Sequence, residues 1–536
     1  MAITVSLQAT FDSEGSWGNR VEFDVTDTKV TSETITSTGS INYVNLQNTG
    51  GKVTVLSLNG NAFLQTNINS AFATQLNSIN ASADTGGFIF NMANTGAGTL
   101  KSGFTFTGGS GVDGLAINKA SLDALTSGSQ LNGGTGTSGN MLAIRDLGTL
   151  TAGEGTKLSA TKGFQILGVL GTTGNLSGDT IIINDAYLTN AFGSHLIDAQ
   201  DGGSLTVTNV KSTYTLDIIN GNYGYTPAAT DFNIGSAAST NTALTVNITP
   251  NYTSLSSPTT PYAGLTLKSL TTTVGTVRSV ALVSNTATSA NIINTYHGSE
   301  NQTLTITGND ALTIGSVTQN TTTGDTINAS GFTQALTLGT TGTSYTAATL
   351  AGDTGKGDVI KLGSGASYLA VSSFTKGDQI TLLSSHTASD TIDTTLIASH
   401  LKNVGTYTNA GAQQTDITQI TNFHSNSDIL KVGIAGGSTA PHIGNTGDLS
   451  GTGWSVTGGF ATKSGSTLTA FLSSVASSTT FAANDVLAYK DGTNTYIVVG
   501  DHTTGTALGE HIIELVGVST ATALGAAGSS TTIHLS

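Results

Sequence analysis

A glycine-rich stretch, Gly108–Ala116, has the spacing best suited to metal chemistry in this chain. Its letters, GGSGVDGLA, match at every specified position a nine-residue pattern of three glycines, an aspartate and a hydrophobic residue. The glycines allow a tight turn with accessible carbonyls, Asp113 supplies a carboxylate, and Leu115 starts a buried strand. Because Ca²⁺ takes about six to eight oxygen ligands, one copy cannot fill a site and a neighbouring turn has to contribute.

We expect calcium ligands at Gly108, Ser110 and Asp113, and the alternative is a glycine-rich turn that binds no metal. A second copy of the pattern, Gly133–Met141, has Ser138 where the aspartate should be. This copy is expected to keep the turn and to lose the carboxylate.

A looser element recurs along the chain, in which an aspartate follows a small or polar residue and precedes a hydrophobic residue by two positions. The aspartates concerned are Asp179, Asp310, Asp325, Asp358, Asp378, Asp428 and Asp485. Each is a candidate calcium ligand, and each is alternatively a solvated turn residue that hydrogen-bonds its own backbone. The formal net charge of −15 favours cation binding, because carboxylates crowded on turns repel one another unless a cation lies between them.

The sequence lacks the common catalytic motifs. It has no His-Glu-x-x-His, no Gly-x-Ser-x-Gly and no cysteine. The nine histidines show no ligand spacing, and we expect each to be a surface or turn residue: His195, His297, His386, His400, His424, His442, His502, His511 and His534. We therefore expect no enzyme. A carbohydrate-active β-solenoid enzyme with paired carboxylates remains an alternative.

The elements that position these residues are predicted to be strands almost throughout. Short runs alternate hydrophobic residues with threonine at 53–58, 204–210, 243–249, 303–307, 311–314, 335–338 and 496–499. Clusters of Gly, Asn, Asp and Ser separate the runs, and only 70–79 and 121–128 favour short helices. The pattern predicts an all-β chain, built as an irregular β-solenoid or from β-sandwich modules, with short Gly, Asn and Asp turns.

Proline marks the clearest domain boundary. Four of the five prolines lie between Pro227 and Pro261, and proline cannot donate a hydrogen bond to a strand ladder. We expect an N-terminal β-rich domain at 1–224, a junction at 225–262, a central solenoid-like domain at 263–410 and a C-terminal β domain at 411–536.

Composition excludes several classes of protein. With 18 basic residues against 33 acidic ones, the chain lacks the basic surface of a nucleic-acid-binding protein. No apolar stretch of about 18 residues suggests a transmembrane helix. Charged residues are only 10% of the chain and hydrophobic residues are 37%, which argues against a disordered segment.

Four segments carry a resemblance to a known family. Phe104–Asp113 resembles the calcium repeats of RTX proteins, and Ile420–Leu430, Asn484–Val499 and His511–Gly517 resemble the C-terminal region of RTX surface-layer proteins of Gram-negative bacteria, of the Caulobacter type. The resemblance implies calcium as cofactor, type I secretion with an uncleaved signal in 411–536, and a location on the cell surface. Tandem nonapeptides and the helical N-terminal anchoring region of that family are missing here.

The resemblance implies a structural protein that self-assembles, in a calcium-dependent way, into a two-dimensional lattice on the cell surface. Its expected partners are other copies of the chain and lipopolysaccharide or another cell-surface polysaccharide. The alternative is an extracellular matrix filament or adhesin subunit, with the same chemistry and one-dimensional assembly.

Overall fold

The structure is a computed structural model of the 536-residue chain. It describes residues 1–8, 21–39, 41–92, 98–126, 129–136, 139–170, 180–188, 192, 194–198, 203–211, 213–219, 230–236, 242–248, 264–274, 277–285, 290–299, 302–319, 326–339, 359–370, 379–394, 417–432, 441–500, 511–526 and 532–535. Within these residues the chain is predominantly β, as the sequence predicts.

The chain divides into two compact units. The first comprises Met1–Lys268 and Asn285–Thr288, and the second comprises Ser269–Ser284 and Ser289–Ser536. Two strands within the predicted junction at 225–262, β18 (Thr230–Ser236) and β19 (Thr242–Ile248), belong to the first unit. The finer division into domains stays a prediction.

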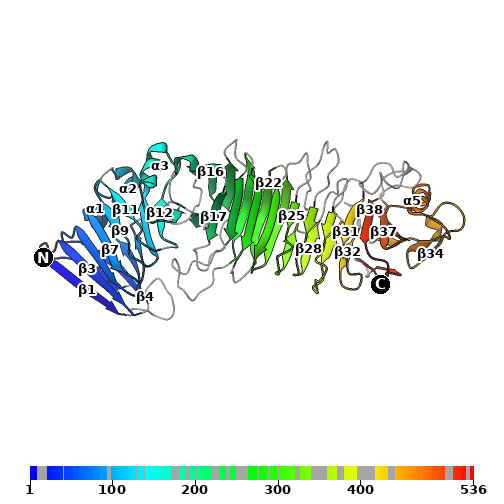
Figure 1. The fold of residues 1–536 in the computed structure, drawn as a ribbon, viewed down its shortest axis with the longest axis horizontal. Coiled ribbons are helices and arrows are strands. Elements are labelled where there is room, and N and C mark those ends of the chain that lie inside the picture. Colours follow the sequence, from blue (N-terminus) through cyan, green and yellow to red (C-terminus); the bar gives the residue numbers. More distant parts are fainter. Residues whose placement is uncertain are drawn as a thin grey trace. The chain divides into compact units, whose positions relative to one another are not determined.

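In the first unit, parallel strands lie side by side in sheets, and most strands pair with the strand two positions further along the chain (Figure 1). One sheet contains β1 (Ala2–Gln8), β3 (Ser32–Thr38), β5 (Val55–Gly60), β7 (Ser78–Asp84), β9 (Thr105–Thr107) and β11 (Gln130–Asn132). Another contains β2 (Val21–Asp24), β4 (Ile41–Gln47), β6 (Phe63–Ile68), β8 (Phe88–Asn91), β10 (Asp113–Asn118), β12 (Met141–Arg145), β13 (Ile166–Leu170), β15 (Ser194–Asp198), β17 (Thr213–Ile219) and β19. A third contains β14 (Thr180–Asn184), β16 (Ser204–Val210) and β18.

The second unit continues the same alternation after β20 (Thr266–Val274), which spans the boundary. One set of parallel strands is β21 (Val277–Ser284), β23 (Thr303–Gly308), β25 (Thr326–Asn328), β27 (Val359–Lys361), β29 (Gln379–Thr381), β31 (Thr418–Thr421) and β38 (His511–Val516). The other is β22 (Asn291–Gly298), β24 (Leu312–Gln319), β26 (Leu336–Leu338), β28 (Ser367–Ala370), β30 (Thr391–Asp393) and β32 (Ile429–Lys431).

Antiparallel strands follow at the C-terminal end of the second unit. β37 (Asn494–Val499) pairs with both β36 (Asp485–Asp491) and β38, and β40 (Thr532–Leu535) pairs with both β32 and β39 (Leu524–Ala526). The remaining described strands are β33 (His442–Ile443), β34 (Ser455–Thr457) and β35 (Phe460–Thr462).

Helices are few and short, as the sequence predicts. α1 (Ser70–Gln75) falls within the segment 70–79 and α2 (Lys119–Ala124) overlaps the segment 121–128, both expected to be helical, whereas α3 (Ala152–Ser159) and α5 (Leu468–Ala476) were not predicted. Two 3₁₀ turns are η1 (Asp185–Tyr187) and η4 (Thr446–Asp448). In the described part of the chain, no helix is long and apolar enough to span a membrane.

Strand register shows how each turn of the chain packs on the next. Thr34 pairs with Ser57 and Ser57 pairs with Asn80, in both cases 23 residues further along, whereas Thr391 pairs with Ile429, 38 residues further along. The repeat length therefore varies. Side chains alternate between core and solvent, so that paired residues such as Leu282 and Ile306 stack as fully buried columns.

Candidate functional site

The predicted ligand Asp113 begins β10, where the glycine-rich stretch enters the sheet. Its Oδ1 accepts the backbone N–H of Phe88 (3.3 Å), and its own N–H donates to Oδ1 of Asn140 (2.9 Å). Asn140 in turn donates its N–H to Oε1 of Gln165 (2.9 Å). Because strand register places these residues at equivalent positions of successive turns, we name Phe88, Asp113, Asn140 and Gln165 the first corner ladder.

Glycine is required where the chain turns into this ladder. A Cβ on Gly108 would clash with the Gly133 carbonyl and with Oδ2 of Asp113. The neighbouring Gly109 donates its N–H to that same Oδ2 (2.6 Å). The absence of side chains therefore lets two turns of the chain approach closely and brings the Gly109 N–H to the carboxylate.

Phe88, Asp113 and Asn140 of the first corner ladder are buried, and burial changes the pKa of Asp113 and of the nearby Asp84. Asp113 is 1% exposed and Asp84, on the turn before it, is 2% exposed. Burial, with a smaller contribution from the charge of Asp84, raises the pKa of Asp113 to about 7 despite the lowering effect of the N–H bonds from Gly109 and Phe88. Burial also raises the pKa of Asp84, which the N–H groups of Gly87 and Gly86 partly offset.

The bonds around Asp113 match a glycine-rich turn that holds itself together without metal. Both carboxylate oxygens accept backbone N–H groups, and Nδ2 of Asn140 donates to the carbonyls of Gly133 (2.7 Å) and Gly163 (2.9 Å). A calcium ion in this turn would have to replace N–H donors by oxygen ligands. Calcium ligation by Gly108, Ser110 and Asp113 stays a prediction.

The other aspartates predicted to bind calcium lie in different surroundings. Asp179, Asp325, Asp358 and Asp378 lie outside the described residues. Asp310 is half-buried before β24, and its Oδ1 accepts the N–H of Ala311 (2.9 Å), as expected of a turn residue. Asp428 and Asp485 are both buried, and each has a histidine beside it.

Asp428 belongs to a second corner ladder, which consists of Ser367, Asp390 and Asp428. The N–H of Ser367 donates to Oδ1 of Asp390 (2.8 Å), and the N–H of Asp390 donates to Oδ1 of Asp428 (3.1 Å). The strands that follow are paired in register, from Tyr368 to Thr391 and from Thr391 to Ile429. An aspartate at the start of a strand, or directly before it, thus bridges neighbouring turns in both units.

Sequence analysis missed the histidines that lie beside these acids. His386 follows a turn, as expected, but its side chain is buried and only 3% of the residue is exposed, so the expectation of a surface position is wrong. The sequence does contain a signal that could have found it. His386 precedes Asp390 by four residues and His424 precedes Asp428 by four, so the same pair occurs in two successive turns.

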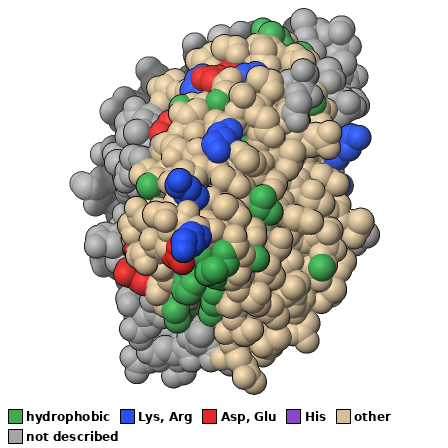
Figure 2. Space-filling view, turned by 90° about the vertical axis from the view of Figure 1, so that its left-hand side faces the viewer, with side chains coloured by type: hydrophobic (Ala, Val, Ile, Leu, Met, Phe, Trp, Pro, Cys, Tyr) green, Lys and Arg blue, Asp and Glu red, His purple; other side chains and the backbone are tan. Residues whose placement is uncertain are grey.

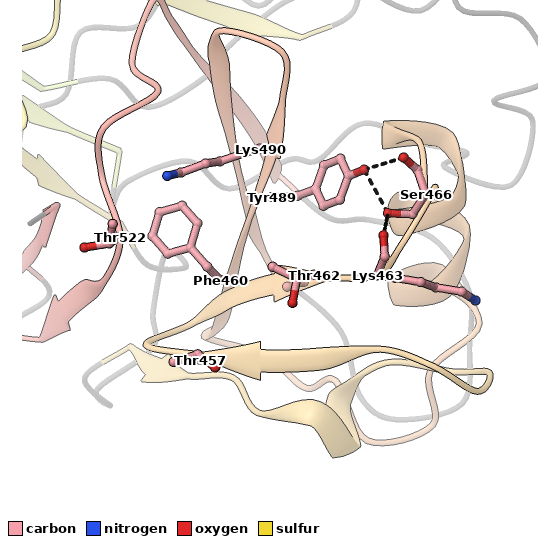
Figure 3. A pocket seen from close by; sticks show the side chains of 9 residues that line it. Thr457, Phe460, Thr462, Lys463, Ser466, Tyr489, Lys490 and Thr522 are labelled. Atoms are coloured by element: carbon pink, nitrogen blue, oxygen red, sulfur yellow. Dashed lines mark hydrogen bonds between the residues drawn. The ribbon is translucent and has the colours of Figure 1, made fainter.

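A pocket of about 330 Å³ in the second unit bears on the alternative that the chain is a carbohydrate-active enzyme. It is lined by Thr457, Phe460, Ala461, Thr462, Lys463, Ser466, Tyr489, Lys490 and Thr522 (Figure 3). The ammonium of Lys490 lies 5.4 Å from the centre of the Phe460 ring, and the hydroxyl of Tyr489 donates to the Ser466 carbonyl (2.9 Å). No acidic residue lines this pocket, so it does not offer the paired carboxylates of a glycosidase.

No protein-family model matches the chain, and no curated protein matches it in sequence.

Proposed function

We propose that this chain is a structural surface-layer protein: a secreted, irregular β-solenoid that assembles with copies of itself into a two-dimensional lattice in the presence of calcium. Parallel pairing of alternate strands supports a solenoid rather than a β-sandwich, whose sheets are antiparallel. Buried columns such as Ile35 and Leu58 suit a rigid building block, because each turn is stabilised by its neighbours.

The observation that carries the proposal is the outer edge of β1. The Met1 carbonyl accepts the N–H of Thr31 and the Leu7 carbonyl accepts the hydroxyl of Thr38 (3.0 Å), so odd-numbered residues of β1 face β3. By alternation, the N–H and C=O groups of Ala2, Thr4 and Ser6 face the other way. Among the described strands only β3 pairs with β1. An open edge of this kind is a template for pairing with another chain.

Exposed hydrophobic side chains accompany this edge. Figure 2 views the first unit from the end that carries β1, and hydrophobic side chains gather there beside basic and acidic ones. Met1, before β1, is 64% exposed, and Val21, at the start of β2, is 39% exposed. Burying such groups against a second copy would add a hydrophobic contribution to the pairing of strand edges.

Calcium enters the proposal through the net charge. Because each copy of the chain carries a formal net charge of −15, copies repel one another in the absence of counter-ions. A divalent cation between acidic surfaces removes that repulsion, which is the reason to expect calcium-dependent assembly. The mode of attachment to lipopolysaccharide or another cell-surface polysaccharide is a further part of the proposal that only binding experiments address.

Negative-stain electron microscopy of the purified chain, with millimolar calcium and with excess chelator, tests the proposal. We expect two-dimensional sheets with calcium and dispersed particles with chelator. Magnesium at the same concentration is the control for general charge screening, and it should give fewer or smaller sheets.

The other outcomes discriminate between functions. Fibres would favour the matrix filament or adhesin, which the strand-edge geometry also allows because edge pairing extends a sheet in one direction. Particles that stay monomeric with and without calcium would refute self-assembly as the function.

A further inference from the structure

We infer that His386, His424, Asp390 and Asp428 form a binding site for one divalent transition-metal ion, with zinc as the best match. The site lies in the second unit, where the segment between β29 and β30 meets the segment between β31 and β32. It is independent of the surface-layer proposal. Sequence analysis considered only Asp428 of these four residues as a metal ligand, and for calcium.

Three of the four side chains, those of His386, His424 and Asp428, bring their ligand atoms close together, and Asp390 lies beside His386. Nε2 of His386 lies 3.0 and 3.1 Å from the two carboxylate oxygens of Asp428 and 3.8 Å from Oδ2 of Asp390. The rings of His386 and His424 stack with centres 4.2 Å apart and planes 9° apart. Ligand atoms of His386, His424 and Asp428 all lie within 4.8 Å of one another. Ligands of a tetrahedral zinc ion are separated by about 3.3 Å, so the side chains would have to draw together and one imidazole would have to turn out of the stack on binding.

The contacts of His386 suit a position at which a metal ion could replace a proton. Nδ1 of His386 is in contact with the carbonyl oxygen of Leu383. Since a carbonyl can only accept, Nδ1 carries a hydrogen and donates it. Nε2 lies at hydrogen-bonding distance from both carboxylate oxygens of Asp428, to which a protonated imidazole donates, and a metal ion bound to Nε2 would take the place of that proton. Such a donor bond from the far ring nitrogen to a carbonyl is the usual support of a metal-ligating histidine.

Asp390 supplies an independent indication. Its side chain is fully buried, and its Oδ1 accepts the N–H of Ser367 (2.8 Å). Its Oδ2 has no hydrogen-bond partner among the described residues. A buried carboxylate oxygen without a partner is costly, and this one faces Nε2 of His386. A metal ion held between Asp390, Asp428 and the imidazoles would satisfy it.

The donor set identifies the class of ion. Calcium prefers about six to eight oxygens and does not select imidazole, whereas zinc is commonly held by four ligands drawn from histidine and carboxylate. His424 is accessible to solvent, so an ion has an entry path that the buried His386 and Asp390 lack. Each turn contributes one histidine and one aspartate, and the ion would cross-link two successive turns.

A second histidine–acid group in the same unit provides a matched control. His442, Asp448 and Asp485 also have ligand atoms close together. Backbone N–H groups bond to carboxylates in both groups, but within the described part of the chain no carboxylate oxygen of Asp448 or Asp485 is buried without a hydrogen-bond partner, whereas Oδ2 of Asp390 is. His442 is also largely exposed, with 65% of its side chain accessible. We expect this group to bind zinc weakly at best.

Calorimetric titration of the chelator-stripped full chain with Zn²⁺ tests the site, and absorption spectra of the Co²⁺-loaded chain report its geometry. The wild type is expected to bind one Zn²⁺ tightly, to give the intense bands of tetrahedral Co²⁺ and to melt at a higher temperature with Zn²⁺ than without. His424→Ala and Asp390→Asn should each weaken Zn²⁺ binding at least about tenfold. His442→Ala should leave it unchanged, and excess Ca²⁺ should not displace the Zn²⁺.

The inference fails if the wild type does not bind Zn²⁺, or if His424→Ala and Asp390→Asn bind it as tightly as the wild type does. It fails equally if His442→Ala removes the tight site. Because His424 is accessible, its replacement by alanine should leave the fold intact, and circular dichroism without metal checks this. The readout is metal binding by single chains, so its result is separate from that of the assembly experiment.

Discussion

Glu33, on β3, shows how a single residue makes stability depend on pH. It is 1% exposed, and neither carboxylate oxygen has a hydrogen-bond partner among the described residues. Burial raises the pKa of Glu33 to about 7. Because this value is above that of an unfolded chain, roughly 4.3, the contribution of Glu33 to stability is full below pH 4 and is lost as the pH rises through 7.

Replacing Glu33 by glutamine should therefore stabilise the chain only at high pH. At pH 8 the variant no longer carries a buried charge, and its free energy of unfolding should exceed that of the wild type by about 3 kcal/mol. At pH 4 the two proteins should differ much less. Urea unfolding at both pH values measures the difference. Glu22→Gln, at an exposed position of β2, is the control. An equal effect of Glu33→Gln at both pH values would contradict the raised pKa of Glu33.

At the scale of single residues, the sequence indicates candidate ligands but not the groups that they contact. The nonapeptide pattern predicts Asp113 as a ligand, and in the structure its carboxylate accepts the N–H groups of Gly109 and Phe88. Phe88 is on the preceding turn, and the pattern within one turn does not determine the register with which turns stack. His386 was missed for the same reason, since its contact with Asp428 is 42 residues distant.

At the scale of elements, the two units share a tight turn at the end of a strand. Gly60 ends β5 with φ of 129°, and Gly308 ends β23 with φ of 124°. A Cβ at either position would clash with a backbone carbonyl, that of Ser37 in one case and that of Ser284 in the other. Both the positive φ and the close approach of the neighbouring turn therefore require glycine.

Gly308→Ala should be strongly destabilising. The clash involves backbone rather than a flexible side chain, and the φ value is one that alanine rarely adopts, so we expect a loss of at least about 2 kcal/mol. Thermal unfolding of the full chain measures it. Gly331→Ala is the matched control, because nothing lies within 4 Å of the Cβ that it would add. Equal melting temperatures for the two variants would show that the turn relaxes easily.

Strands were predictable because two-residue alternation is a local property. The run at 204–210 is β16 (Ser204–Val210), and the run at 303–307 lies within β23. Pairing between strands was not predictable in the same way. The distance along the chain between paired residues of successive turns is 20 residues between Val359 and Gln379 but 40 between Gln379 and Gln419. No fixed period in the sequence marks these partners.

At the scale of the whole molecule, the open edge of β1 decides how copies of the chain could join. Residues of β1 with even numbers direct N–H and C=O groups away from β3, and Thr4 lies in the middle of the strand with its side chain exposed. If copies pair through this edge, the N–H of Thr4 is part of the contact. A proline there removes that donor without breaking the bonds between β1 and β3.

Thr4→Pro should therefore abolish calcium-dependent assembly while leaving the monomer folded. Thr4→Val keeps the N–H and a β-branched side chain, so it should assemble as the wild type does. Electron microscopy with calcium compares the three proteins, and circular dichroism with chelator confirms that each is folded. Sheets formed by Thr4→Pro as readily as by the wild type would exclude the β1 edge as the contact and would assign assembly to another surface of the chain. Loss of assembly in both variants would point instead to the Thr4 hydroxyl, a side-chain contact rather than strand pairing.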